Sequence, residues 1–154
     1  MKVLSVLLFF PTLVWPLQSI AQGNRVATYQ EYERAYLSND AKAMARWLAP
    51  SAELSETLHV AGKSDTRHMS REQLLESMRQ VGAESQDPLS SSSQVTISDA
   101  TPTGFCASAT AYDQTVVAGR KYQQREERNA CFVLAGASYQ VKSHSIDIFY
   151  TPLK

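Results

Sequence analysis

Cysteine, histidine and charge of one sign are all scarce in this sequence of 154 residues. It contains two Cys and three His, and its 15 Lys and Arg balance 15 Asp and Glu. Two Cys are too few for a disulfide scaffold or a four-cysteine zinc site. The balanced charge offers no basic surface of the kind that nucleic-acid-binding proteins need, so we expect no nucleic-acid partner. The length and an apolar fraction of 44% favour one globular domain with a proper core.

The common catalytic and nucleotide-binding motifs are missing as well. The sequence has no glycine-rich phosphate loop, no Gly-x-Ser-x-Gly elbow and no His-Glu-x-x-His pair. His59, His68 and His144 lack the spacing of a zinc site, so we predict neither a metal nor a cofactor. Serines are so numerous that many Ser/His/Asp triads can be assembled on paper, and no particular combination is favoured.

One long apolar run occurs, and it lies at the start of the chain. Residues 3–17 are mostly apolar and follow a short basic start, and small residues then precede the bond after Ala21. This layout is typical of a secretory signal peptide, whereas a membrane anchor needs a longer run without prolines. We predict that residues 1–21 are a signal peptide and that residues 22–154 form the mature domain. Its expected location is periplasmic or secreted, with no membrane association after cleavage.

The residues after the apolar run carry the signals of two helices. Thr28 and Glu31 have the spacing of a capping box, and the tyrosines after Thr28 repeat at intervals of three and four, which predicts a helix over 29–38. Asp40 can cap a second short helix that ends before Pro50.

A strand and a third helix are predicted next. Residues 52–60 alternate between apolar and polar side chains, which is typical of a half-buried strand, and Gly62-Lys63 provides a turn. Ser70 and Gln73 form a second capping box, and Gly82 is a plausible stop for the helix that it opens. The expected inward side chains of this helix are those of Leu74, Leu75, Met78 and Val81. A Ser-rich connecting loop over 84–94 comes after it.

The rest of the chain has the pattern of a β-meander. Val95 and Ile97 mark a strand, residues 101–104 a turn, and long strands are expected over 105–117, 120–135 and 138–150. Helices first and strands afterwards predict an α+β domain, in which N-terminal helices cover one face of a curved antiparallel sheet.

The two cysteines fall opposite each other if Ala118-Gly119 is a two-residue hairpin loop. The same number of steps separates Val117 from Cys106 as separates Arg120 from Cys131. The register makes them a non-hydrogen-bonded pair, whose short Cα separation suits a disulfide. We predict a structural disulfide worth on the order of 3 kcal/mol. The alternatives are two buried thiols that fill space, or a redox-active pair.

One face of the three long strands is expected to meet the helices if Gly136-Ala137 is a second two-residue loop. Its apolar side chains are those of Phe105, Ala107, Ala109, Ala111, Ala130, Phe132, Tyr139 and Val141. The small alanines leave room for either a closely packed helix or a cavity. The other face, which would include His144, is polar and is expected to face solvent or a dimer interface.

The helix-facing side of the strands becomes polar toward one end, where Asp113, Glu126, Arg128, Ser145 and Asp147 follow. In this register Glu126 and Asp147 are cross-strand neighbours, with Arg128 near both. Two carboxylates held together in a dry site raise one pKa, which is how a general acid or base is made. The favoured alternative is a solvated salt bridge at the rim of the sheet, because most charged groups on strands are exposed.

The order of elements resembles the nuclear transport factor 2-like superfamily, the cone-shaped α+β fold shared with ketosteroid isomerases and SnoaL-like polyketide cyclases. The resemblance rests on "SNDAKAMARWLAPSAELSE" after a tyrosine-bearing helix, on "SREQLLESM", and on a meander that ends in "SYQVKSHSIDIFY". Asp40 matches the Asp that usually precedes the second helix, and Tyr139 stands where many members have Trp. The resemblance implies a pocket at the open end of the cone, and a homodimer is a common state in the family.

The expected pocket residues are Tyr32, Tyr36, Phe105, Ala109, Asp113, Phe132 and Val141. We expect an exported domain that binds a small apolar ligand there or a protein partner, without a catalytic motif. An alternative is a small lyase or isomerase that uses Glu126 or Asp147 as base, Arg128 to stabilise charge and Tyr32 or Tyr36 as donor. A further alternative is a partner-neutralising or assembly factor that uses the convex face of the sheet.

Overall fold

The computed structural model describes residues 15–81 and 94–153, the side chains of 15–23 excepted. Within them the elements run α1 (Trp15–Leu37), α2 (Ala41–Trp47), β1 (Leu48–Val60), β2 (Lys63–Met69), α3 (Arg71–Val81), β3 (Val95–Thr101), β4 (Gly104–Val117), β5 (Arg120–Ala135) and β6 (Ser138–Pro152). The predicted signal peptide, the predicted stop at Gly82 and the predicted loop 84–94 lie wholly or mostly outside the described residues and stay predictions. None of the described helices combines the length and apolar character needed to cross a bilayer.

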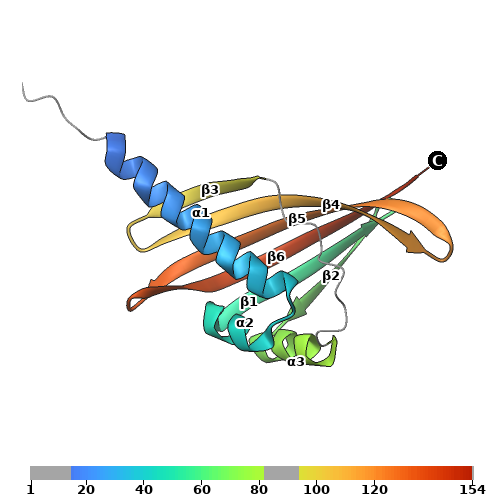
Figure 1. The fold of residues 1–154 in the computed structure, drawn as a ribbon. Helices are drawn as coiled ribbons and strands as arrows, with labels where there is room; N and C mark the ends of the chain where they lie inside the picture. The colour runs from blue at the N-terminus through green and yellow to red at the C-terminus, as the bar shows by residue number, and fades with distance from the viewer. Residues whose placement is uncertain (1–14, 82–93, 154) are drawn as a thin grey trace, which may run out of the picture.

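The six described strands form one curved sheet in the order β2-β1-β6-β5-β4-β3, and the helices lie against one of its faces (Figure 1). The α+β class is confirmed. Strands β1 and β6 run parallel, whereas every other neighbouring pair is antiparallel, so the sheet is mixed. Strand β2 was not predicted. Its side chains are almost all exposed, so it shows none of the alternation that marks a half-buried strand.

Two of the three predicted helix caps are confirmed. The carboxylate of Asp40 accepts a hydrogen bond from the backbone N–H of Ala43 at 2.9 Å. Ser70 and Gln73 cap each other, because each backbone N–H donates to the other's side-chain oxygen. The predicted cap at Thr28 is wrong. Helix α1 begins upstream, so the hydroxyl of Thr28 lies inside it and donates to the carbonyl of Asn24 four residues back.

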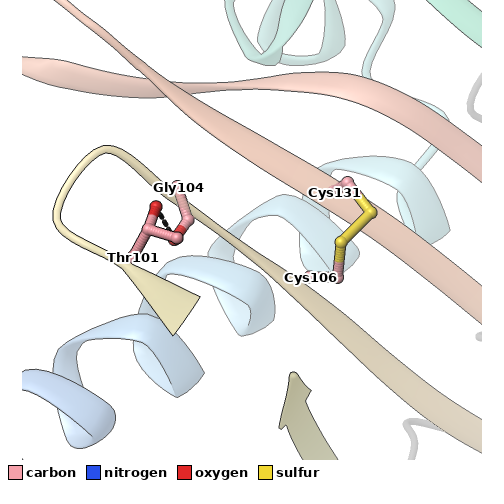
Figure 2. Close-up of a disulfide and its surroundings, with 4 residues drawn as sticks. All are labelled: Thr101, Gly104, Cys106 and Cys131. Atoms are coloured by element: carbon pink, nitrogen blue, oxygen red, sulfur yellow. Dashed lines mark hydrogen bonds between the residues drawn. A yellow bond between two sulfur atoms is a disulfide. The ribbon is translucent and has the colours of Figure 1, made fainter. Parts of the chain in front are cut away.

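The predicted disulfide is confirmed, and so is the hairpin that sets its register. Ala118 and Gly119 both have positive φ, which matches the tight hairpin turn expected between β4 and β5. Cys106 and Cys131 are directly opposite each other and are bonded, close to the turn in which the hydroxyl of Thr101 donates to the carbonyl of Gly104 (Figure 2).

The register between β5 and β6 changes about a third of the way along β6 from the hairpin, and this was not predicted. Phe132 pairs with Val141, but Cys131 pairs with Ser143, which leaves Lys142 as an extra residue in β6. Such a β-bulge shifts the side-chain alternation by one position, so every later residue of β6 changes face. The chain before Lys142 follows the expected register, and the chain after it does not.

Two predictions fail because of this bulge. Glu126 pairs with Ile148 rather than with Asp147, which lies opposite Glu127 on the outer face, away from the helices. The predicted carboxylate pair is therefore wrong. His144 was expected on the outer face, but it turns inward and its exposed fraction is only 5%.

The core lies between the helices and the inner face of the sheet. Phe105 and Phe132 stack with ring centroids 4.7 Å apart, and Tyr29 and Tyr32 of α1 lie edge-on to Phe132. The inward alanines of β4 and β5 are buried under this layer. Of the two alternatives for these alanines, the structure has the closely packed helix.

Candidate functional site

A half-open cavity lies between α3, the end of α1 and strands β1, β2 and β6. Its volume of about 110 Å³ is small beside the roughly 300–1,000 Å³ of sites for drug-sized molecules, so it suits a small ligand or one end of a larger one. Apolar and polar side chains contribute about equally to its wall. The lining residues are Tyr36, Asn39, Leu54, Ser55, Glu56, Arg67, Met69, Leu74, Ser77, Met78, Val81, His144 and Ile146.

His144 is the most buried polar side chain on this wall. Its Nδ1 is 2.7 Å from the hydroxyl oxygen of Tyr32, and its ring lies edge-on to Tyr36 at 5.2 Å. Burial and, to a lesser degree, the positive charge of Arg128 lower the pKa of His144 to about 4. Burial also raises the pKa of Tyr32 and of Tyr36 far above neutral pH. All three side chains are therefore uncharged at pH 7.

The hydrogen bond with Tyr32 indicates the tautomer of His144. A phenol hydroxyl is a stronger donor than acceptor, so we assign Tyr32 as the donor, which makes Nδ1 the acceptor and places the imidazole proton on Nε2. None of the fully buried side-chain N and O atoms in residues 15–81 and 94–153 lacks a hydrogen-bond partner. Nε2, which has no protein partner, is therefore open to the water of the cavity and can donate to a ligand there.

Arg128 and two carboxylates form a separate buried cluster. The Arg128 guanidinium donates to Glu126 at 2.7 and 3.0 Å and to Glu33 of α1 at 2.9 Å, and the amide of Gln124 also donates to Glu126. Exposed fractions are 2% for Arg128 and 6% for each glutamate. Burial opposes the charge of Arg128, but the carboxylates outweigh it, and its pKa is raised.

The solvated rim salt bridge favoured from the sequence is therefore wrong. Arg128 and Glu126 lie on an inner strand face that α1 covers, and Glu33 completes the cluster. Both oxygens of Glu126 already accept hydrogen bonds from Arg128 or Gln124. A carboxylate held in this way is poorly suited to act as a general base. Neither Glu126 nor Arg128 lines the cavity.

The predicted pocket residues are mostly core residues. Tyr36 alone among them lines the described cavity. Tyr32, Phe105, Ala109, Phe132 and Val141 are buried in the core, and Asp113 is exposed near the β4–β5 hairpin.

Sequence reasoning missed Glu33 and His144 for identifiable reasons. Glu33 follows Tyr29 by four positions, so the helical repeat places it on the same buried face of α1. His144 lies just after the point where the apolar residues of β6 change phase, from Tyr139 and Val141 to Ile146 and Ile148. A change of phase inside a strand is the signal of a β-bulge. In the described part of the chain no three His, Cys, Asp or Glu side chains are gathered as metal ligands.

Solved structures resemble this arrangement along most of the chain. A protein of unknown function from Silicibacter pomeroyi, described as NTF-2 like, has 17% identity and a TM-score of 0.53, and the match covers 85% of this chain and 98% of that one. The chain has the nuclear transport factor 2-like fold. No protein-family model matches the sequence, and no curated protein matches it either.

Two further structures with the nuclear transport factor 2-like fold show the range of proteins built on it. Hexachlorocyclohexane dehydrochlorinase LinA-type3 from Novosphingobium barchaimii has 10% identity, a TM-score of 0.60, and coverage of 88% of this chain and 94% of that one. A ketosteroid isomerase-like protein from Erwinia carotovora atroseptica has 10% identity, a TM-score of 0.53, and coverage of 79% and 91%. At these identities the likeness is one of fold, and activity has to be argued from the residues of this chain.

Proposed function

We propose that this protein is an exported domain that binds a small, mostly apolar ligand in the cavity beneath α3. The observation that carries the proposal is the neutral, almost fully buried imidazole of His144 on a cavity wall that mixes apolar and polar side chains. Small-molecule sites combine apolar walls with a few polar groups that orient the ligand. A ligand with one acceptor oxygen can take the place of the water that otherwise accepts from Nε2.

The polar groups also indicate what kind of ligand suits the site. His144 and Tyr36 are uncharged at pH 7, so the inner end of the cavity favours a neutral acceptor such as a carbonyl or an ether over a carboxylate. Glu56 and Arg67 line the same cavity, 3.7 Å apart and partly exposed, and can contact a polar end of the ligand. An amphipathic ligand with its neutral acceptor inside fits this distribution.

Export is the second part of the proposal. It is supported by the basic start and apolar run of residues 1–17 and by the disulfide, a bond that forms and persists in oxidising compartments. Cleavage after Ala21 would leave Gln22–Leu37 of α1 in place. The mass of the protein recovered from a bacterial periplasm tests this directly, with loss of residues 1–21 as the expected result.

Ligand binding is tested by titration with N-phenyl-1-naphthylamine, an uncharged apolar fluorophore. We expect saturable enhancement at about one probe per chain. Ser77→Trp adds bulk to the cavity wall from an exposed position of α3, so it should weaken binding about tenfold or more. Gln80→Trp, on the same helix but off the cavity wall, should leave binding unchanged. Enhancement that does not saturate, or equal effects of the two variants, contradicts the proposal.

The role of His144 is tested separately. His144→Phe keeps the ring but removes the N–H donor, so it should weaken ligands that carry a carbonyl while it leaves a pure hydrocarbon probe unaffected. Native mass spectrometry of the exported protein would in addition reveal a ligand that co-purifies. Equal losses for both kinds of ligand would assign His144 a packing role only.

A further inference from the structure

A Ser–His–Asp arrangement lies on the outer face of the sheet, on the side opposite the helices. Ser64 of β2, His59 of β1 and Asp147 of β6 meet across three neighbouring strands. His59 Nδ1 is 2.8 Å from the hydroxyl oxygen of Ser64, and Nε2 is 2.9 Å from a carboxylate oxygen of Asp147. The side chains of His59 and Asp147 are about one third exposed, and Ser64 is exposed.

The strand register explains why these side chains touch. Val60 and Lys63 flank a two-residue turn in which Ala61 and Gly62 both have positive φ, so they form a hydrogen-bonded pair. The next pair, His59 and Ser64, is then a non-hydrogen-bonded pair, in which opposite side chains lie closest. Asp147 reaches His59 because the bulge in β6 has turned it to this face.

Two contacts hold the imidazole of His59 in one orientation. Its ring stacks on Phe149 with centroids 4.2 Å apart and an interplanar angle of 4°. An ionised carboxylate only accepts hydrogen bonds, so the Asp147 contact places the proton on Nε2. Nδ1 is then the acceptor, and the hydroxyl of Ser64 donates to it. This is the polarity that a serine nucleophile requires of its general base.

A donor for a developing oxyanion is also at hand. In a non-hydrogen-bonded pair the backbone N–H of Ser64 points away from β1. Strand β2 is the edge of the described sheet, so none of the described strands pairs with that N–H. The N–H of the nucleophilic residue itself is a usual member of an oxyanion hole. The guanidinium of Arg125 lies 4.1 Å from the centroid of the Phe149 ring, on the face away from His59, so Phe149 is packed between the two side chains.

We propose that Ser64, His59 and Asp147 form an acyl-transfer site that hydrolyses small, accessible esters. The oxygen of Ser64 attacks the ester carbonyl while Nδ1 of His59 takes the hydroxyl proton, and the alcohol leaves with that proton. Nδ1 of His59 then takes a proton from a water molecule that attacks the acyl-serine, the acid is released, and that proton returns to the oxygen of Ser64. Asp147 is a positioning residue, because it acts through His59. The open position on the sheet restricts the site to unhindered esters.

The site is tested with a biotinylated fluorophosphonate, which phosphonylates an activated serine with loss of fluoride. Trypsin cleaves after Lys63 and Arg67, so the labelled peptide Ser64–Arg67 contains a single serine and identifies the site. We expect label on this peptide from the folded protein, none in Ser64→Ala, and labelling at least about tenfold slower in Asp147→Asn. The rate of p-nitrophenyl acetate hydrolysis should be highest in the wild type, lower in Asp147→Asn and lowest in Ser64→Ala.

Ser145→Ala provides the matched control, because Ser145 lies on the same outer face but opposite Ser55 rather than His59, and it should label at the wild-type rate. Circular dichroism would establish that each variant is folded. An unlabelled peptide in the wild type, or equal labelling of wild type and Asp147→Asn, overturns the proposal. The outcome is independent of ligand binding in the cavity, since Ser77→Trp should label normally.

Discussion

The buried cluster around Arg128 makes a strong prediction about stability. In Arg128→Met the methionine fills part of the space, but Glu33 and Glu126 are left buried and close together without their cation. Breaking a buried ion pair in this way costs about 3–5 kcal/mol, whereas an exposed pair contributes about 0–1 kcal/mol. Since small domains have about 5–15 kcal/mol of stability in total, the variant should lose a large part of it at pH 7.

The loss should depend on pH in a defined direction. Without Arg128, two negative charges lie buried close together, and this cost is present only while both glutamates are ionised. Acid that neutralises them removes the cost, so the variant should lose least at low pH. The variant should therefore differ from wild type less at pH 4.5 than at pH 7.5. Adding Glu33→Gln and Glu126→Gln to Arg128→Met should recover much of the loss at pH 7.5.

Urea unfolding with the disulfide intact measures these differences. Arg125→Met is the control, because Arg125 pairs with Glu127 on the same strand but is about 41% exposed, and it should cost about 1 kcal/mol or less. A cost below about 1 kcal/mol for Arg128→Met at pH 7.5 would refute the reasoning, since that is the value of a solvated pair.

Three further predictions concern the disulfide, a helix cap and a buried histidine. Cys106→Ser, or reduction of the disulfide, should cost on the order of 3 kcal/mol in urea unfolding, because the bond closes a loop of 25 residues; thiol labelling of the unfolded, unreduced protein should find no free cysteine. Ser70→Ala should cost about 1 kcal/mol through loss of the α3 cap, whereas Ser77→Ala, in the middle of the same helix, should be neutral or slightly stabilising in thermal unfolding. Because the folded pKa of His144 is about 4, below the ordinary value of 6.5, stability should be full above pH 6.5 and fall by about 3 kcal/mol toward pH 4. This fall should be much smaller in His144→Gln and unchanged in His68→Gln, and equal slopes in both variants would contradict the assignment.

The elements that could be predicted are those whose signals are local. The two-residue turn at Ala118-Gly119 allowed the β4–β5 register to be predicted, and from that register followed the disulfide between Cys106 and Cys131. The caps at Asp40 and Ser70 depend on side chains within three residues of each other. Strand β2 could not be found in this way, because an exposed edge strand has no buried face and therefore no alternation to detect.

The candidate site depends on contacts between distant segments, and these were missed. The environment of Arg128 is decided by Glu33, which lies on a helix 95 positions earlier in the chain. The environment of His144 is decided by one extra residue in β6 and by Tyr32, 112 positions earlier. Asp147 was predicted to face the helices beside Glu126, but the bulge places it on the outer face opposite Glu127.

Lys142 has a consequence for how this chain can change over time. Deleting this one residue would restore a regular pairing between β5 and β6, so every side chain of β6 after position 142 would move to the opposite face of the sheet. Asp147 would enter the interior beside Glu126, and His144 would leave Tyr32 for solvent. A single-residue insertion or deletion at this position therefore alters both the inner cavity and the outer face without replacing any residue in either, and a relative that lacks the residue should not be assumed to share their chemistry.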